Sequence, residues 1–248
     1  MRLRSLLLHC CIPAVAVALP AQTITGNIII KRKLTKPSVT ASVSVYQRGT
    51  TIKLGQDGDL DPVAYERSRV VVYLETPVSP GRNSSDSPEP QIQQLDRRFT
   101  PDFVVVPIGS TVSFPNMDPI FHNIYSLSKP KTFDLGNYDK SQTRKVTFPK
   151  PGIVEIYCHL HPNMQATVVV TPNRWYARPD RDGQYRIPDV PAGQYTLVAW
   201  HKTAGFFRKA IVVEDGRVTS ADFLIPVDAE PKKEAQQQRD VDHKAGSR

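Results

Sequence analysis

Short apolar runs, each about as long as one strand, constrain the fold of this chain more than any other feature. From residue 23 onward these runs alternate with polar residues or stay continuous, and Gly, Pro, Asn and Asp bound them. No stretch keeps a helical period with caps at both ends, and 22 of the 248 residues are proline, which helix interiors tolerate poorly. Strands are predicted at 23–31, 42–46, 69–75, 103–107, 111–114, 123–127, 144–148, 153–157, 165–170, 183–187, 195–200, 208–213 and 219–225. A strand about every ten residues favours an all-β protein made of sandwiches or barrels.

The first residues predict export. Two arginines precede an apolar run over 6–19, and small residues follow it. This arrangement is typical of a secretory signal peptide, here over 1–21, and the run is too short for a membrane-spanning helix. We expect cleavage near Ala21, with Ala18 as the other candidate. The mature protein would then be periplasmic or secreted, with no integral membrane segment, and a retained single anchor is the alternative.

Cysteine usage narrows the chemistry. The chain has three cysteines, and Cys10 and Cys11 lie inside the run that we expect to be removed. Cys158 would then be the only thiol of the exported protein. Exported chains usually pair or avoid cysteine, because a free thiol in an oxidising compartment is exposed to oxidation. The presence of Cys158 therefore needs an explanation, and the alternatives are an intermolecular disulfide, inert burial, nucleophilic catalysis and metal ligation.

Sulfur and imidazole groups cluster around this cysteine. The run 157–164 (YCHLHPNM) follows an apolar strand and contains a thiol, two imidazoles and a thioether. Cys158 and His161 are spaced so that both can point at one centre, and Met164 can approach it from the side. Soft sulfur with imidazole selects copper among first-row metals, and a His₂Cys plane with a weak axial Met is the arrangement of blue-copper electron-transfer sites. The second imidazole must come from elsewhere, and His122 is the candidate.

Other interpretations of these residues are weaker. A zinc site would usually avoid methionine, and a Cys–His nucleophile pair would need a base from a distant segment and an oxyanion donor. We therefore expect that the protein is not an enzyme. Met117 is expected to fill a core. Strand alternation would turn His159 away from the metal as an exposed or hydrogen-bonded residue, and an extra ligand or an access point for copper or electrons is the alternative.

An ordered series of residues extends this cluster over 91–171. It consists of Phe99-x-Pro101, Gly109, Val112-x-Phe114-x-Asn116-x-Asp118, His122-Asn123, Phe148-x-x-Pro151-Gly152, Cys158-x-x-His161-x-x-Met164 and Val168-x-Val170. This series closely resembles a cupredoxin of the plastocyanin and amicyanin type. The short Cys-x-x-His-x-x-Met loop, with Pro162 after the second histidine, looks most like amicyanin.

The resemblance implies a Greek-key β-sandwich with one type 1 copper ion. It makes His122, Cys158 and His161 the equatorial ligands and Met164 the axial ligand. It also implies a supporting shell of Asn123, Asn116 and His159, in which the Asn123 amide braces the ligand loop and its backbone N–H tunes the Cys158 sulfur. A rigid site of this kind keeps nearly the same geometry in both copper oxidation states, so little reorganisation accompanies electron transfer.

A second module is indicated by hairpin signals within 176–201. Asp-Gly and Ala-Gly dipeptides there supply the positive φ that tight turns need. The stretch resembles the carboxypeptidase-regulatory-like, transthyretin-like β-sandwich, but few residues remain after residue 173 for such a domain. The run 23–28 looks like its opening strand, and 69–74 looks like its third.

We therefore predict a discontinuous carboxypeptidase-regulatory-like β-sandwich, made of 22–80 with 173–227. The cupredoxin domain, 91–172, would be inserted into it, and a polar tail over 228–248 would be disordered. A sequential layout, with an elongated cupredoxin over 22–172 followed by a small module, is the alternative.

The remaining features predict no further chemistry. A linker is expected at 79–89, and His201 is expected to be a polar tip beside a packing tryptophan, with a metal site as the alternative. The formal net charge of +8 is scattered, so we expect no nucleic-acid partner. The densest basic region consists of Lys129, Lys131, Lys140, Arg144, Lys145 and Lys150. It could steer an acidic redox partner, and a merely solvated face is the alternative.

Together these features predict an exported copper-binding cupredoxin that carries single electrons. Its redox partner protein would be acidic or haem-containing. The alternative is copper storage or delivery, or a structural surface protein with a vestigial copper site.

Overall fold

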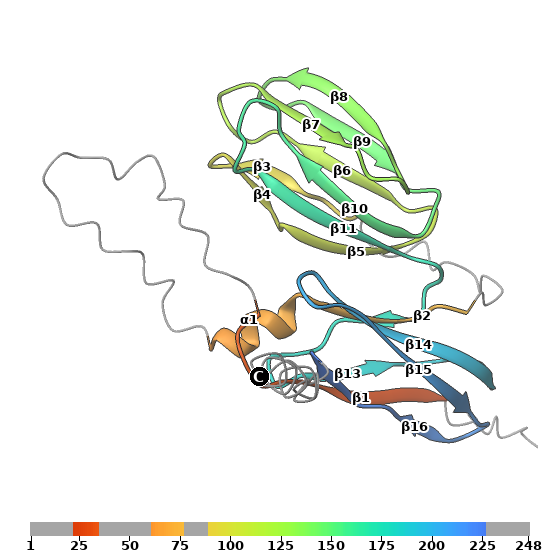
Figure 1. Ribbon diagram of the computed structural model, residues 1–248. Coiled ribbons are helices and arrows are strands. Elements are labelled where there is room, and N and C mark those ends of the chain that lie inside the picture. Colours follow the sequence, from red (N-terminus) through yellow and green to blue (C-terminus); the bar gives the residue numbers. More distant parts are fainter. Residues whose placement is uncertain (1–21, 35–60, 77–88, 227–248) are drawn as a thin grey trace, which may run out of the picture.

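The computed structural model describes residues 22–34, 61–76 and 89–226 (Figure 1). Several predictions lie outside the described residues, namely the signal peptide over 1–21 with its two cysteines, the strand at 42–46, most of the linker at 79–89 and the tail over 228–248.

The described chain is all-β, as predicted, apart from one short helix. In chain order the elements are β1 (Thr23–Ile30), α1 (Pro62–Ser68), β2 (Val70–Leu74), β3 (Gln93–Leu95), β4 (Arg98–Thr100), β5 (Phe103–Pro107), β6 (Thr111–Pro115), β7 (His122–Ser126), β8 (Phe133–Tyr138), β9 (Thr143–Thr147), β10 (Gly152–Tyr157), β11 (Gln165–Thr171), β12 (Tyr176–Ala177), β13 (Gln184–Ile187), β14 (Gly193–His201), β15 (Gly205–Val213), β16 (Val218–Ser220) and β17 (Phe223–Ile225). Figure 1 shows two stacked bodies, which we call the first sandwich (β1, α1, β2 and β12 to β17) and the second sandwich (β3 to β11).

The first sandwich joins strands from both ends of the chain. In one of its sheets, β1 pairs antiparallel with β13 and parallel with β16 and β17. The other sheet has the order β12-β2-β14-β15. Every strand that pairs with β1 thus follows residue 173, and β2 lies between β12 and β14. The assignment of 22–80 with 173–227 to a carboxypeptidase-regulatory-like domain stays a prediction.

Strand periodicity explains the core of the first sandwich. Side chains alternate between the two faces of a strand, and in β1 Ile24 and Ile28 are buried whereas Asn27 and Ile29 are exposed. The buried set packs on the inner face of the β2 and β14 sheet, and the cluster includes Ile24, Ile28, Ile30, Val70, Val72, Leu74, Trp175, Tyr185, Ile187, Leu197 and Ala199.

The second sandwich contains a five-stranded sheet of order β5-β11-β10-β7-β8. β11 runs parallel to β5 and antiparallel to β10, whereas β6 pairs with β9 and β3 pairs with β4. Their apolar side chains enclose one core, which includes Ile92, Phe99, Val106, Val112, Phe114, Ile124, Tyr138, Phe148, Val154, Ile156, Cys158, Met164 and Val168.

A third apolar cluster joins the two sandwiches. Val71, Tyr73, Val198 and Trp200 of the first sandwich pack with Phe103 and Val169 of the second. The rings of Phe103 and Trp200 stack with centroids 6.1 Å apart. All five residues of β2 are therefore buried, because one face meets the first core and the other meets this junction. A strand covered on both faces needs a continuous apolar run, which is the pattern VVVYL.

The periodicity did not predict α1 or the short strands β3, β4, β8 and β12. The helix begins at an Asp61 cap, whose carboxylate accepts from Val63 N at 2.9 Å, and Pro62 occupies its first turn.

The predicted strand at 219–225 is interrupted at Ala221, where the backbone N–H bonds to Thr25 O. Among the described residues, no helix is long and apolar enough to cross a membrane.

Candidate metal centre

Three predicted ligands meet at one end of the second sandwich. His122 opens β7, Cys158 follows β10, and His161 lies in the loop between β10 and β11. The two Nδ1 atoms of the histidines are 3.1 Å apart, and the Cys158 Sγ lies 4.0 Å from His122 Nδ1 and 3.7 Å from His161 Nδ1. Among the residues that the structure describes, these form one group of potential metal ligands whose donor atoms lie within 4.8 Å of one another.

Strand pairing brings the ligands together. β7 and β10 are neighbours, with Tyr125 opposite Tyr157, so the start of β7 lies beside the residues that follow β10. The ligand loop is closed by a bond from Met164 N to His161 O of 2.9 Å. Cys158 and His161 therefore lie in one short loop, whose second half, from His161 to Met164, is a tight turn, and His122 is presented by the adjacent strand.

The donor triangle fits a metal ion. The circle through the three donor atoms has a radius of about 2.1 Å, and imidazole and thiolate bind metals at about 2.0 to 2.3 Å. His122 and Cys158 are buried, and His161 is partly exposed. Burial and the nearby His122 lower the pKa of His161, so its imidazole is neutral and has a lone pair to donate. Two imidazoles and one soft thiolate form a donor set that suits copper.

Met164, the predicted axial ligand, ends the same loop. Its side chain is buried in the same core cluster as Cys158. The ligand role stays a prediction.

Asn123 contacts the cysteine through its backbone. Its N–H donates to Cys158 Sγ at 3.5 Å, and its Nδ2 donates to Asp134 Oδ1 at 2.7 Å. The backbone N–H of Gly136, together with Asn123, lowers the pKa of Asp134 and keeps this carboxylate ionised. Asn123, which follows His122, is thereby held through both its backbone and its side chain.

Asn116 braces the loop that precedes His122. Its Nδ2 donates to Ile120 O at 2.9 Å and to Tyr138 O at 3.0 Å, and its Oδ1 accepts from Asp118 N at 2.9 Å. The side chain is fully buried, so these bonds form in the interior.

Asp118 contacts a predicted ligand directly, and sequence reasoning assigned it no role. Its Oδ2 lies 2.8 Å from His122 Nε2. Burial acts to raise the pKa of Asp118, but the N–H groups of Arg97 and Asp96 and the bond to His122 outweigh it and lower that pKa. An acidic residue four positions before a histidine ligand is a weak signal, because the chain must loop back before the two side chains can meet.

His159 lies at the edge of the site. Its Nε2 is 3.2 Å from Asp134 Oδ2, and its ring stacks on Tyr125 with centroids 3.7 Å apart. Both members of this histidine and aspartate pair are about half-exposed.

The prediction that Met117 fills a core is wrong, because its side chain is 46% exposed in the loop between β6 and β7.

His201 is not the polar tip that we expected. It is fully buried, and its Nε2 lies 3.1 Å from Oε2 of Glu66, which is also fully buried. The helix α1, which the periodicity did not predict, carries this glutamate into the first sandwich.

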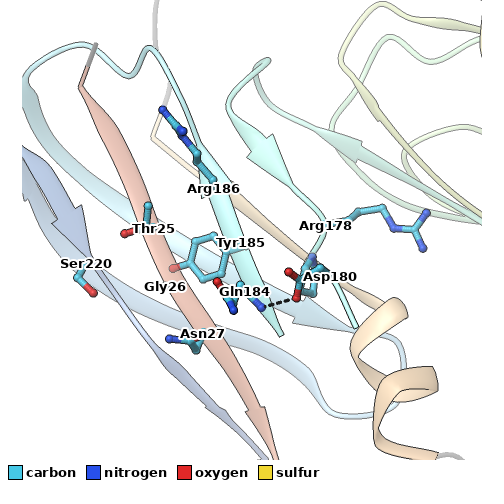
Figure 2. A pocket seen from close by; sticks show the side chains of 10 residues that line it. Thr25, Gly26, Asn27, Arg178, Asp180, Gln184, Tyr185, Arg186 and Ser220 are labelled. Atoms are coloured by element: carbon cyan, nitrogen blue, oxygen red, sulfur yellow. Dashed lines mark hydrogen bonds between the residues drawn. The ribbon is translucent and has the colours of Figure 1, made fainter. Parts of the chain in front are cut away.

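A pocket of about 540 Å³ lies on the first sandwich, away from the triangle (Figure 2). Its lining includes Thr25, Asn27, Asp180, Gln184, Arg186 and Ser220, without cysteine or histidine. Asp180 accepts from Gln184 N at 2.8 Å. Arg178 turns its guanidinium out of the pocket and donates to Ser68 O. The pocket therefore offers no soft metal ligands.

No family model and no curated protein matches the chain. Solved cupredoxin structures do match it. A copper(I) form of an amicyanin variant is 22% identical, over 32% of this chain and 79% of that chain, with a TM-score of 0.31. A purple cupredoxin from Nitrosopumilus maritimus is 24% identical, over 33% and 99%, with a TM-score of 0.31. A reduced copper(I) amicyanin variant at pH 4 is 20% identical, over 41% and 98%, with a TM-score of 0.32. Likeness at this level assigns neither a ligand nor a function, and the resemblance to a carboxypeptidase-regulatory-like domain stays a prediction.

Proposed function

We propose that this chain is an exported copper protein that carries single electrons through one type 1 copper centre. His122, Cys158 and His161 would be the equatorial ligands and Met164 the axial ligand. The donor triangle carries the proposal, because its size suits a metal ion without movement of the ligand residues. A copper ion held there would supply one-electron chemistry by alternating between Cu(II) and Cu(I).

The protein's own groups would keep the site rigid. Asn123 N–H donates to the cysteine sulfur and stabilises its thiolate form. Asn116 holds the loop before His122, and the Met164 to His161 turn holds the other loop. A site held from both sides changes little when its charge changes, which favours rapid electron transfer, and an axial Met164 would fill the position beside the triangle. We therefore propose a carrier and not an enzyme.

Electrons would enter and leave at His161, the ligand that is partly exposed. The residues before the two histidine ligands are exposed and apolar, Phe121 at 59% and Leu160 at 46%. Exposed apolar side chains beside a site favour contact with a partner protein. We propose a redox protein, acidic or haem-containing, as that partner. The support is the basic region, most of which is exposed, although the charge of Lys145 is already balanced by Glu89 at 2.7 Å.

The test is the optical and EPR spectrum of the purified mature protein after copper addition. We expect an intense thiolate-to-copper charge-transfer band and a narrow copper hyperfine splitting, both lost in Cys158→Ser. Tetragonal copper without the band would reject the type 1 centre. Copper transfer to an apo-acceptor without redox turnover would instead favour storage or delivery.

A further inference from the structure

The carboxylate beside His122 is held in place from three directions. Asp118 Oδ1 accepts from Asp96 N at 2.8 Å, and Oδ2 accepts from Arg97 N at 3.0 Å. The backbone N–H of Asp118 donates to Asn116 Oδ1. The carboxyl group is buried, so these bonds are not shared with bulk water.

The turn between β3 and β4 is shaped for this contact. Asp96 and Arg97 both have positive φ, 52° and 56°, which non-glycine residues rarely adopt. Their successive N–H groups converge on the two oxygens of one side chain. The turn thus forms a small anion-binding nest around Asp118.

These contacts determine the form of the His122 ring. Both Asp118 oxygens accept backbone N–H groups, so the group acts as an ionised acceptor. His122 Nε2 must then carry the hydrogen of the 2.8 Å bond. In the neutral ring this tautomer leaves the lone pair on Nδ1, the atom that faces Cys158 and His161.

We infer that Asp118 is a positioning residue for the copper centre. It would fix the His122 tautomer and ring angle, and it would place a fixed negative charge beside the ligand that favours Cu(II) over Cu(I). This inference rests on the proposed function. Carboxylates that support a histidine ligand typically change metal affinity by about 10 to 100-fold when they are substituted.

Asp134 offers a comparison. It is also an aspartate beside the site, but its side chain bonds to Asn123, Gly136 and His159 and not to the His122 ring. It is half-exposed, so solvent weakens the effect of its charge on the centre. A general loss of negative charge would thus affect both variants alike, whereas a positioning role predicts the larger effect for Asp118.

The first measurement uses the copper-free wild-type protein. Nitrogen-15 NMR of the His122 ring should show a hydrogen on Nε2 that is bonded to a carboxylate. A ring without a hydrogen on Nε2 would overturn the inference, and this readout depends neither on copper nor on the folding of a variant.

The second measurement compares Asp118→Asn with Asp134→Asn after copper loading. We expect Asp118→Asn to bind Cu(II) about tenfold more weakly with little change for Cu(I), which raises the reduction potential by about 59 mV. Asp134→Asn, which alters the bond to Asn123 but no bond to a ligand ring, should change both quantities less than Asp118→Asn does. Equal potentials and affinities in the two variants would overturn the inference, whereas a wild-type protein without the thiolate band would overturn the proposed function.

Discussion

Removal of the His201 imidazole should strongly destabilise the first sandwich. His201 Nδ1 accepts the N–H groups of Thr203 and Ala204, each at 3.1 Å. Nε2 therefore carries the hydrogen and donates to Glu66 Oε2 at 3.1 Å, and Glu66 Oε1 accepts from Leu34 N at 2.9 Å. One imidazole thus bonds to a buried carboxylate and to the turn between β14 and β15.

His201→Ala would leave the buried Glu66 carboxylate without this donor. Leaving a buried charged acceptor without one of its donors costs about 1 to 3 kcal/mol, so we expect the free energy of unfolding to fall by about 3 kcal/mol. The double variant His201→Leu with Glu66→Leu removes both polar partners. It should recover part of that loss, because replacing both partners of a buried hydrogen bond by apolar groups can be nearly neutral.

Urea unfolding of the copper-free protein, followed by tryptophan fluorescence, measures these differences. His159→Ala is the control. It also removes a histidine that bonds to a carboxylate, that of Asp134, but this pair is half-exposed and should contribute less than about 1 kcal/mol. The reasoning fails if His201→Ala costs no more than His159→Ala, or if the double variant is as unstable as His201→Ala.

The same pair should make stability depend on pH. Burial lowers the pKa of His201 in spite of the opposing effect of Glu66, so the folded protein holds a neutral imidazole. In the unfolded chain a histidine has a pKa of about 6.5, and the unfolded state therefore binds more protons as pH falls below that value. Stability should decrease between about pH 7 and pH 5. The double variant should lose part of this slope, and an unchanged slope would contradict the assignment.

Three further predictions concern the metal centre and the junction. Met164→Leu should keep the copper colour and raise the reduction potential. Met117→Leu, at an exposed position, should change neither the colour nor the potential. Loss of all copper binding in Met164→Leu would refute the axial role. Copper at about 100 times its dissociation constant should stabilise the folded protein by about 2.7 kcal/mol in thermal unfolding, and Cys158→Ser should abolish this shift. Trp200→Ala should cost about 3 to 5 kcal/mol, because the ring fills the junction core. The control is Asp102, whose carboxylate pairs with Arg69 at 2.7 Å and is half-exposed, so Asp102→Ala should cost only about 1 kcal/mol. Equal losses in urea unfolding would contradict a junction held mainly by apolar packing.

Most strands could be predicted because their burial pattern is local. The alternation of apolar and polar residues in β1 corresponds to a strand with one covered face, and the continuous apolar run of β2 corresponds to a strand covered on both faces. α1 could not be predicted in the same way. It is seven residues long, and its buried Glu66 is satisfied by His201, which lies 135 positions later in the chain. A contact at that separation depends on how β14 and the helix pack and leaves no periodic signal.

The sequence by itself determined the chemistry of the candidate site. Cys158 and His161 are three positions apart, so one turn brings their donor atoms together whatever the remainder of the chain does. Only the tertiary structure decided that His122, 36 positions before Cys158, completes the triangle, because this depends on β7 pairing with β10. The same holds for the Asp118 contacts with the β3 to β4 turn, which join residues more than 20 positions apart. Donor types belong to individual residues, whereas distances between donors on different strands are set by pairing and packing.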